Sequence, residues 1–230
     1  MSLGTRQEVQ DNLVQIRAGI ERAAIRAGRD PAQVQLVAAS KTVPAEAIGW
    51  VVEAGVVAIG ENYVKELRQK HDRLPPRVEW HFIGTLQASS AHHVAALADV
   101  VETVAGDRAV DRLARRAAEA GRVMDVLIEV DLTGERTGVP PEAVGALADR
   151  LDSVEGIRLR GLMTLPPMPQ TPEDARPWFT TLRELRDRVR ERHQEVLELS
   201  MGMSLDYEVA VEEGATMVRV GTASFGPRTP

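Results

Sequence analysis

The sequence predicts an α/β protein, built as a single (β/α)8 barrel of the TIM type with one extra N-terminal helix. Short runs rich in β-branched residues alternate with longer helical patterns along the whole chain, which is typical of parallel strands joined by helical crossovers. A doubly wound open sheet would show the same alternation. The strand-like runs number eight, however, the number at which side chains just fill the interior of a closed barrel. The chain also ends almost directly after the eighth run, and both observations favour the barrel.

The eight predicted strands leave room for a helix between each pair. They comprise residues 34–39, 56–60, 79–84, 99–104, 123–130, 157–163, 196–201 and 216–221. Between them, apolar residues recur at three- and four-residue spacing, as in RAVDRLARRAAEA, which indicates amphipathic helices. The predicted helix starts are Pro44, Asp107 and the Pro140–Pro141 pair, and the predicted helix ends are Gly28, Gly55 and Gly121.

Two longer segments remain to be placed in this barrel. The amphipathic segment 6–27 precedes the first strand, and no helix follows the last strand. We therefore expect segment 6–27 to cover the gap beside the eighth strand. The proline-rich segment 165–177 is expected to be an ordered loop after the sixth strand. With no linker long enough to divide it, the chain 1–230 is expected to form a single domain.

The composition is that of a soluble globular protein, with 43% hydrophobic and 27% charged residues. The formal charge of -6 argues against nucleic acid as a partner, and the absence of cysteine excludes disulfides and thiolate chemistry. The N-terminus is polar, and the longest apolar run is interrupted by Glu53. We therefore expect a cytoplasmic protein without a membrane partner, and a monomer because no long apolar stripe is evident.

Ligands of such barrels bind where the C-terminal ends of the strands meet, and the loops after strands seven and eight commonly bind phosphate. Here these loops read LSMGMSLD and VRVGTASFG. Gly202, Gly221 and Gly226 would let backbone N–H groups approach an anion, and Ser204 and Thr222 add hydroxyls. Ser204 is also expected to open a short helix, whose N-terminus would attract the anion. The alternative is that the glycines only form turns, but position and chemistry together favour phosphate.

Lys41 directly follows the first predicted strand, in a chain that contains only three lysines, the others being Lys65 and Lys70. One interpretation is a lysine whose stem is buried and whose charge reaches solvent. The other is a lysine that forms a Schiff base with a phosphorylated aldehyde bound across the barrel mouth. Pyridoxal 5'-phosphate (PLP) is the obvious candidate, with Arg219 facing its ring nitrogen. A sugar phosphate bound without any cofactor is the rival.

At these residues the sequence resembles the pyridoxal phosphate homeostasis protein family, also called YggS/PROSC-like. Matching segments extend over nearly the whole chain and occur in the same order. They are LVAASKTVP, GENYVKEL, WHFIGTLQ, GLMTLPP and, most specifically, LSMGMSLDYEVAVEEGATMVRVGTASFG. The resemblance implies the barrel of the alanine racemase N-terminal domain and a protein of intracellular PLP homeostasis that buffers or delivers the cofactor.

Carried over position by position, the resemblance implies that Lys41 holds PLP as an internal aldimine and that Arg219 pairs with the pyridine nitrogen. A guanidinium stays protonated and cannot accept a proton from the ring, so the ring would be a poor electron sink. The other residues implied to bind the cofactor are Asn62 beside it, Ser204, Gly221 and Thr222 at the phosphate, and Ser200 in an assisting role.

The chain departs from the usual family pattern at two segments. An Asn-Lys pair that most members have after LQ is replaced by Ser89–Ser90, and a Glu-x-x-Lys-x-Gly segment is replaced by the shorter GERTG at 134–138. Roles of additional rim lysines, such as handing PLP to PLP-dependent apoenzymes, are therefore not implied for this chain. Lys41 is the lysine that remains at the site.

The resemblance implies a PLP-binding protein without established catalysis. Racemisation needs two bases, and in the related racemases the second is a tyrosine from another domain. Tyr63 and Tyr207 are the only tyrosines here, and Tyr63 is expected to pack beside the site. Loss of a positioned acid or base costs roughly a hundred- to ten-thousand-fold in rate. A weak racemase-like PLP enzyme acting on amino acids remains the alternative.

Other polar residues at the predicted rim receive structural interpretations. Glu61 is expected to be an acid at the N-terminus of a helix, and Asp131 to cap the turn after strand five. His92 and His93 are interpreted as helix surface, because adjacent side chains on a helix diverge too far to chelate well. No metal site is predicted, and His81 is not expected to be a metal ligand.

Overall fold

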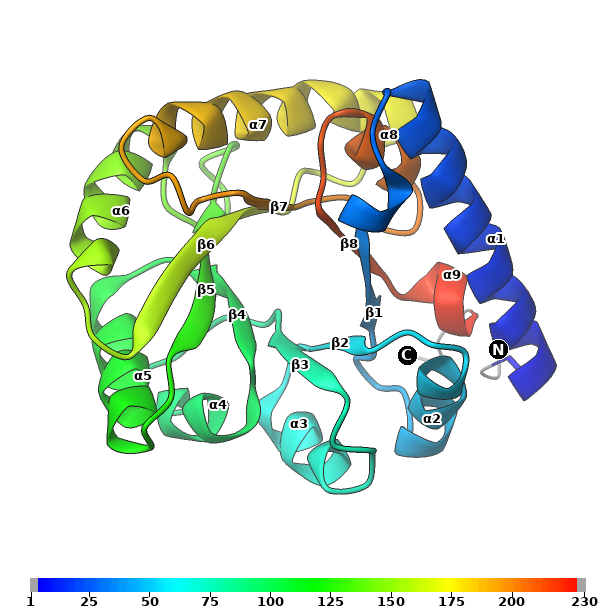
Figure 1. Cartoon of the computed structure of the whole chain (residues 1–230), viewed down its shortest axis with the longest axis horizontal. Helices are drawn as coiled ribbons and strands as arrows, with labels where there is room; N and C mark the ends of the chain where they lie inside the picture. Colours follow the sequence, from blue (N-terminus) through cyan, green and yellow to red (C-terminus); the bar gives the residue numbers. More distant parts are fainter. Residues whose placement is uncertain (1–3, 227–230) are drawn as a thin grey trace.

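The computed structural model describes residues 4–226 and shows a closed barrel of eight parallel strands in the order β1 to β8 (Figure 1). The strands are β1 (Gln35–Ala39), β2 (Ala58–Glu61), β3 (Glu79–Phe82), β4 (Val100–Val104), β5 (Met124–Val130), β6 (Ile157–Thr164), β7 (Glu198–Ser200) and β8 (Met217–Val220). β8 pairs with β1, Arg219 lying opposite Val37, and this pairing closes the barrel. The predicted fold class is confirmed, and each strand lies within two residues of its predicted bounds.

Helices form the outer layer around the strands (Figure 1). They are α1 (Arg6–Arg26), α2 (Ala45–Glu53), α3 (Val64–His71), α4 (Ala91–Leu97), α5 (Asp107–Glu119), α6 (Val144–Asp152), α7 (Arg176–Arg190), α8 (Tyr207–Glu212) and α9 (Thr222–Phe225), with 3-10 turns at Pro31–Gln33, Pro141–Ala143 and Pro172–Ala175. No helix within residues 4–226 combines the length and the apolar character needed to cross a lipid bilayer.

Helix α1 covers the junction between the last and the first strand, as the sequence predicted, although the short helix α9, which was not expected, follows β8 and packs against α1. It begins with a reciprocal cap in which Glu8 N donates to Thr5 Oγ1 at 3.3 Å and Thr5 N donates to Glu8 Oε2 at 2.6 Å. Its buried face packs against α8, α9 and α2, which lie beside it in Figure 1. Gly19 allows the close approach to α8, because a Cβ there would lie 2.3 Å from the Tyr207 hydroxyl.

The local signals for helix boundaries are also confirmed. Pro44 is the N-cap of α2, and α5 begins at Asp107. The Pro140–Pro141 pair opens the 3-10 turn that leads into α6. The loop predicted over 165–177 is confirmed only for 165–171, because Thr171 caps the 3-10 turn Pro172–Ala175 and α7 begins at Arg176. Gly28, Gly55 and Gly121 lie just beyond helix ends, with φ of 66°, 84° and 66°.

The expectation that Ser204 opens a helix is wrong. Helix α8 begins at Tyr207 with Asp206 as its N-cap, and Ser204 lies in the turn before it. That turn is closed by Tyr207 N, which donates to Met203 O at 2.9 Å, and by Met203 N, which donates to Asp206 Oδ1 at 2.6 Å. Because the turn is fixed by these two bonds, the Ser204 hydroxyl is left to accept a bond from elsewhere.

The barrel interior is polar towards its C-terminal end. Because side chains alternate along a strand, Glu102 shares a face with Val100, and Arg219 shares a face with Met217. The apolar members of this face form a small cluster, separate from the larger core between strands and helices, that consists of Val100, Leu127 and Met163. The charged side chains of Glu102 and Arg219 therefore fill the barrel interior on the C-terminal side of an apolar layer.

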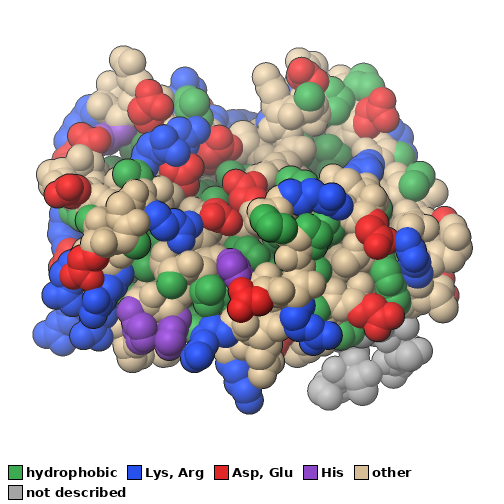
Figure 2. Space-filling model, turned by 60° about the horizontal axis from the view of Figure 1, so that its bottom comes forward, with side chains coloured by type: hydrophobic (Ala, Val, Ile, Leu, Met, Phe, Trp, Pro, Cys, Tyr) green, Lys and Arg blue, Asp and Glu red, His purple; other side chains and the backbone are tan. Residues whose placement is uncertain are grey.

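The outer surface carries no field of a single sign on the face shown in Figure 2, where acidic and basic side chains are interspersed. This agrees with the formal charge of -6, which is small for a chain of 230 residues.

Candidate functional site

A pocket of about 300 Å³ opens at the C-terminal ends of the strands, over β7, β8 and β1. It brings together four residues that the sequence assigned to one ligand, namely Ser204, Arg219, Gly221 and Thr222. The rest of its wall is formed by Ala39, Met168, Pro169, Met203, Leu205 and Asp206.

The turn regions of this pocket offer hydrogen-bond groups suited to an anion. Ser204 Oγ accepts a bond from Ala223 N at 3.1 Å, which ties the turn before α8 to α9. The hydroxyl of Thr222 is exposed and has no hydrogen-bond partner within residues 4–226. Gly202, with φ of 92°, lies so close to α8 that a Cβ would meet the Ala210 Cβ at 2.5 Å. These hydroxyls fit a phosphate group.

Asp206 is the one acidic residue in the pocket wall. It is buried, and its Oδ2 has no hydrogen-bond partner among the described residues. Burial raises the pKa of Asp206, although the bond from Met203 N and the charge of Arg219 oppose the shift. Because its pKa is raised, this carboxyl group holds its proton more strongly than a solvent-exposed aspartate does.

Arg219 reaches this pocket from within the barrel and is held there by three groups. Its Nη2 donates to Thr164 O at 2.8 Å, its Nη1 donates to Ser200 Oγ, and Nη1 lies 3.7 Å from Glu102 Oε2. The side chain is 4% exposed, and its Nε has no acceptor among the described residues. Only two of the five N–H groups of the guanidinium donate to acceptors among the described residues, so further N–H groups of a fixed cation, that on Nε included, are left for a ligand.

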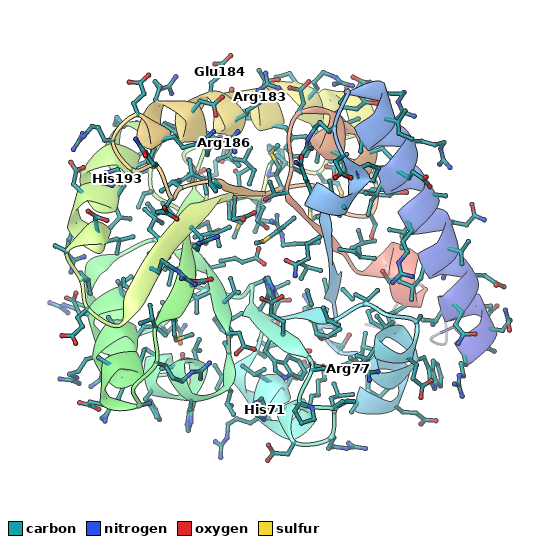
Figure 3. The ribbon with its side chains drawn as sticks, viewed as in Figure 1. His71, Arg77, Arg183, Glu184, Arg186 and His193 are labelled. Carbon is teal, nitrogen blue, oxygen red and sulfur yellow. The ribbon has the colours of Figure 1, made fainter. Side chains whose placement is uncertain are left out.

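His81 extends this network across the barrel, whose interior is filled with side chains (Figure 3). Its Nδ1 lies 2.7 Å from Glu102 Oε1, and both side chains are completely buried. Burial alone would lower the pKa of His81, but the hydrogen bond and charge of Glu102, together with the nearby carboxylate of Glu79, outweigh it and raise the pKa to about 9. The Glu79 carboxylate lies 3.6 Å from Nε2, beyond hydrogen-bond distance, so Glu102 is the main partner.

Glu102 thus carries its negative charge between two cations. Burial would raise its pKa, but the bond and charge of His81, with help from Arg219 and Ser200, hold the pKa below its ordinary value. By contrast, His71 and His193 lie in the outer layer (Figure 3). The sequence analysis missed Glu102, although a charged residue at an inward-facing position of a strand was a usable signal.

Ser200 does not line the pocket. It is fully buried at the end of β7, where its hydroxyl donates to Glu102 Oε2 and accepts from Arg219 Nη1. The structure therefore places Ser200 beneath Arg219 rather than beside Ser204 and Thr222.

Lys41 follows β1, the strand that pairs with β8. Ala38 lies opposite Val220, so Lys41 and the Gly221–Thr222 turn continue from adjacent strands. The Lys41 amine is half-buried, finds no hydrogen-bond acceptor in the described part of the chain, and lies 5.8 Å from the centroid of the Tyr63 ring. It is not part of the pocket wall itself but stands at the neighbouring strand end.

Asn62 lines a second pocket, of about 260 Å³, over β2 to β5. Its Nδ2 donates to Ile83 O at 3.5 Å, and the carboxylate of Glu129 lies in the same pocket wall. Tyr63 is the N-cap of α3, and its ring lies beside Lys41, which agrees with the expected position next to the site. At 50% exposed, however, it is less buried than a packed side chain.

Two rim acids were interpreted from the sequence, with opposite outcomes. Asp131 caps its turn as predicted, accepting from Thr133 N at 2.9 Å, Gly134 N at 3.0 Å and Arg136 N at 2.8 Å. Glu61 is not a helix-terminal acid. It is the last residue of β2, is fully buried, and forms an ion pair with Lys70, which no sequence pattern places beside it.

Comparison of the chain with known proteins shows the family to which it belongs. The profile described as "Alanine racemase, N-terminal domain" matches residues 12–229. A pyridoxal phosphate homeostasis protein of Aquifex aeolicus is 41% identical over 222 residues, covering 95% of this chain and 97% of that protein. The protein of the same name from Escherichia coli K12 is 36% identical over 232 residues, covering 96% and 97%. The chain belongs to the pyridoxal phosphate homeostasis protein family.

A solved structure agrees with this membership. PipY of Synechococcus elongatus PCC7942, determined with PLP bound, superposes with a TM-score of 0.85 at 32% identity. The match covers 95% of this chain and 100% of that chain. The resemblance stated from the sequence motifs is confirmed, and so is the alanine racemase N-terminal type of barrel.

Proposed function

We propose that this protein binds PLP at the pocket over β7, β8 and β1 and serves intracellular PLP homeostasis by buffering or delivering the cofactor. The observation that carries the proposal is the grouping of Ser204, Arg219, Gly221 and Thr222 in one pocket wall, next to the strand end that bears Lys41. The names of the curated relatives and the PLP in the PipY structure support it.

Each predicted ligand takes a role that suits its chemistry. When bound, PLP supplies an aldehyde that condenses with a primary amine with loss of water. Lys41 supplies the amine, while Ser204, Gly221 and Thr222 hold the phosphate. Asn62, which lines the pocket over β2 to β5 on the other side of the barrel mouth, would lie beside the cofactor. The lone hydroxyl of Thr222 and the uncommitted Nε of Arg219 make these assignments chemically consistent.

Arg219 donates to the ring nitrogen, and Ser200 positions Arg219 from below. A guanidinium is too weak an acid to transfer its proton to the ring nitrogen and cannot accept a proton from it, so the ring nitrogen would remain neutral. The bound cofactor then withdraws electrons weakly. This favours a carrier over a catalyst of amino-acid chemistry, and we propose that the protein has no substantial turnover.

A weak racemase-like PLP enzyme is the second candidate, because the Tyr63 phenol lies beside the Lys41 amine. The two candidates differ in exchange of the amino-acid α-proton with deuterated water. For a carrier, alanine incubated with the PLP-loaded protein shows no exchange above free PLP. Steady exchange that is lost in Lys41→Ala and Tyr63→Phe variants would favour the enzyme.

The main test is the site of covalent capture. Protein loaded with PLP is reduced with borohydride, which makes the C=N bond permanent, and then digested and mapped by mass spectrometry. The proposal expects the pyridoxyl group on Lys41. A protein that shows no aldimine absorbance after PLP is added and unbound PLP is removed would instead favour a barrel acting on a sugar phosphate without the cofactor.

Delivery has its own test. We propose PLP-dependent apoenzymes as recipients and a monomer as the carrier. Loaded protein mixed with an apoenzyme should activate it faster than the same protein releases PLP into buffer. Equal rates would mean that the protein buffers PLP without delivering it.

A further inference from the structure

A buried ion cluster lies directly beneath the Lys41 turn. It consists of Glu61 at the end of β2 together with Glu66 and Lys70 on α3. The Lys70 side chain is 8% exposed and the Glu61 side chain is completely buried, whereas most charged residues of the chain lie on its surface. Nothing in the roles assigned above uses this cluster.

The Lys70 ammonium is fully committed to this site. It donates to Glu61 Oε1, to Glu66 Oε2 at 2.7 Å and to Ser40 O at 2.9 Å. An ammonium group has three N–H donors, and here each has an acceptor. Lys70 is thus saturated and enclosed, while the Lys41 amine has no acceptor within residues 4–226.

The bonds of this cluster reach the two residues that flank Lys41. On one side, Ser40 O accepts from Lys70, and Ser40 Oγ donates to Glu61 Oε1. On the other side, Thr42 N donates to Glu66 Oε2 at 2.8 Å. The same Glu66 oxygen accepts from both Thr42 and Lys70, so one carboxylate joins the turn to the ammonium.

The turn between these bonds is strained. Val43 N donates to Ser40 O at 2.9 Å, and Thr42 lies within the turn at φ 63°, the only positive φ of a residue other than glycine in the described chain. A β-branched residue rarely adopts this conformation, and it persists only where its surroundings fix it. Within the turn, Thr42 Oγ1 donates to Lys41 O at 2.6 Å, and the Glu66 bond to Thr42 N holds this residue from outside the turn.

We propose that Lys70 and Glu66 act as positioning residues for Lys41, holding the Ser40–Val43 turn in the conformation that aims the Lys41 amine at the ligand pocket. This inference rests on the proposed function, because it concerns the amine that captures PLP. It also assigns the two lysines different duties. Lys70 supports the turn and is shielded from the aldehyde, and Lys41 reacts with it.

The test compares Glu66→Ala and Lys70→Met with Lys65→Met, a matched control on the same helix whose side chain is exposed. The readouts are the rate of covalent PLP capture, followed by visible absorbance, and the induced circular dichroism of the bound chromophore. We expect capture to slow about tenfold to a hundredfold in Glu66→Ala and Lys70→Met, since a misplaced amine seldom adopts the geometry needed to attack the aldehyde carbon. The dichroic signal should also change, and Lys65→Met should match the natural chain.

A second experiment separates positioning from general loss of stability. Glycine takes a positive φ without strain, so Thr42→Gly should reduce the need for the Glu66 bond. Capture by the double variant Thr42→Gly/Glu66→Ala should therefore exceed capture by Glu66→Ala alone, even if their thermal midpoints are the same. If Lys70→Met does not fold, the Glu66 series decides, because Glu66 is partly exposed and alanine suits a helix.

The possible results are distinct. If the natural chain captures no PLP on Lys41, the proposed function fails. If it does, but Glu66→Ala and Lys70→Met capture PLP at the rate and with the dichroism of Lys65→Met, the positioning role is overturned and the proposed function stands. Absence of rescue by Thr42→Gly would also count against the strained turn as the means of positioning.

Discussion

Arg219 and Glu102 face each other inside the barrel, with Nη1 of the arginine 3.7 Å from Oε2 of the glutamate and Ser200 bonded to both. The guanidinium that lines the ligand pocket is therefore fixed from the interior and not from solvent. Since a buried arginine with three partners has little freedom, the N–H groups that it leaves for a ligand have defined directions. The pocket is prepared before a ligand arrives.

Removal of the Lys41 amine should abolish covalent capture without unfolding the protein. Lys41 is half-buried at a strand end and has no hydrogen-bond partner in the described chain, so Lys41→Ala should change the free energy of unfolding by less than about 1 kcal/mol. Lys65→Ala is the control. Borohydride reduction with peptide mapping should find no pyridoxyl group in the Lys41 variant. A group found on Lys65 or Lys70 of the natural protein would contradict the assignment.

Loss of the Thr222 hydroxyl should weaken PLP retention while leaving the fold unchanged. A hydrogen bond to a charged group contributes about 1.5–3 kcal/mol, so Thr222→Ala should raise the Kd roughly tenfold to a hundredfold. Equilibrium dialysis measures this directly. Thr181→Ala, on the exposed side of α7, should bind PLP as the natural chain does. Equal affinities for both variants would exclude Thr222 from the phosphate site.

Folding stability should fall between neutral and alkaline pH because of His81. Its pKa is raised to about 9 in the folded protein, against about 6.5 in an unfolded chain. A raised pKa contributes stability that is fully present below pH 6.5 and lost as the pH passes through 9, amounting to at most ~3 kcal/mol.

Urea unfolding at several pH values measures this loss, and NMR titration of the His81 ring gives the pKa independently. His92→Asn, a change on the exposed face of α4, should leave the pH dependence in place. His81→Asn should remove it. A ring that titrates near 6.5 in the folded protein would mean that Glu102 does not stabilise its charge.

Gly84 should not tolerate any side chain, because a Cβ there would lie 1.9 Å from the carbonyl oxygen of Asn62. Gly84→Ala must displace the loop after β2, and forced packing of this kind costs about 1–3 kcal/mol. Chemical denaturation should show the loss, and PLP affinity should fall with it because Asn62 moves. Gly145→Ala is the control: its Cβ would meet nothing within 4 Å, and alanine favours the helix. A Gly84 variant as stable as that control would contradict the close approach.

The sequence predicted those parts of the fold that depend on local patterns. Strand β4 could be recognised from VVETV and helix α2 from Pro44, since a buried strand and a helix start each leave a signal within a few residues. Capping of the turn by Asp131 was predicted for the same reason. The start of α8 was misplaced because both Ser204 and Asp206 are suited to a helix N-terminus, and only the packed turn decides between them.

The buried charges could not be paired from the sequence. Glu102 meets Ser200 across 98 residues, and Lys70 meets Ser40 across 30. Such pairs depend on which strands become neighbours and on which faces point inward, so they follow from barrel closure and leave no mark at either position. Family motifs predicted the ligand residues as a group, but they gave no sign that Ser200 lies beneath Arg219 and not at the pocket wall.

The packing of α1 ties the earliest part of the chain to the latest. Asn12 Nδ2 donates to Ser224 O at 3.4 Å, and Gly4 N donates to Phe225 O at 3.1 Å. During synthesis α1 leaves the ribosome long before α8 and α9. Its apolar face therefore remains exposed to solvent until those helices have been made. Contacts so distant in sequence are slow to form. Nascent chains interrupted before β8 would therefore expose the apolar face of α1 and the unpaired edge of β1. Chaperones bind surfaces of both kinds, and both kinds promote aggregation.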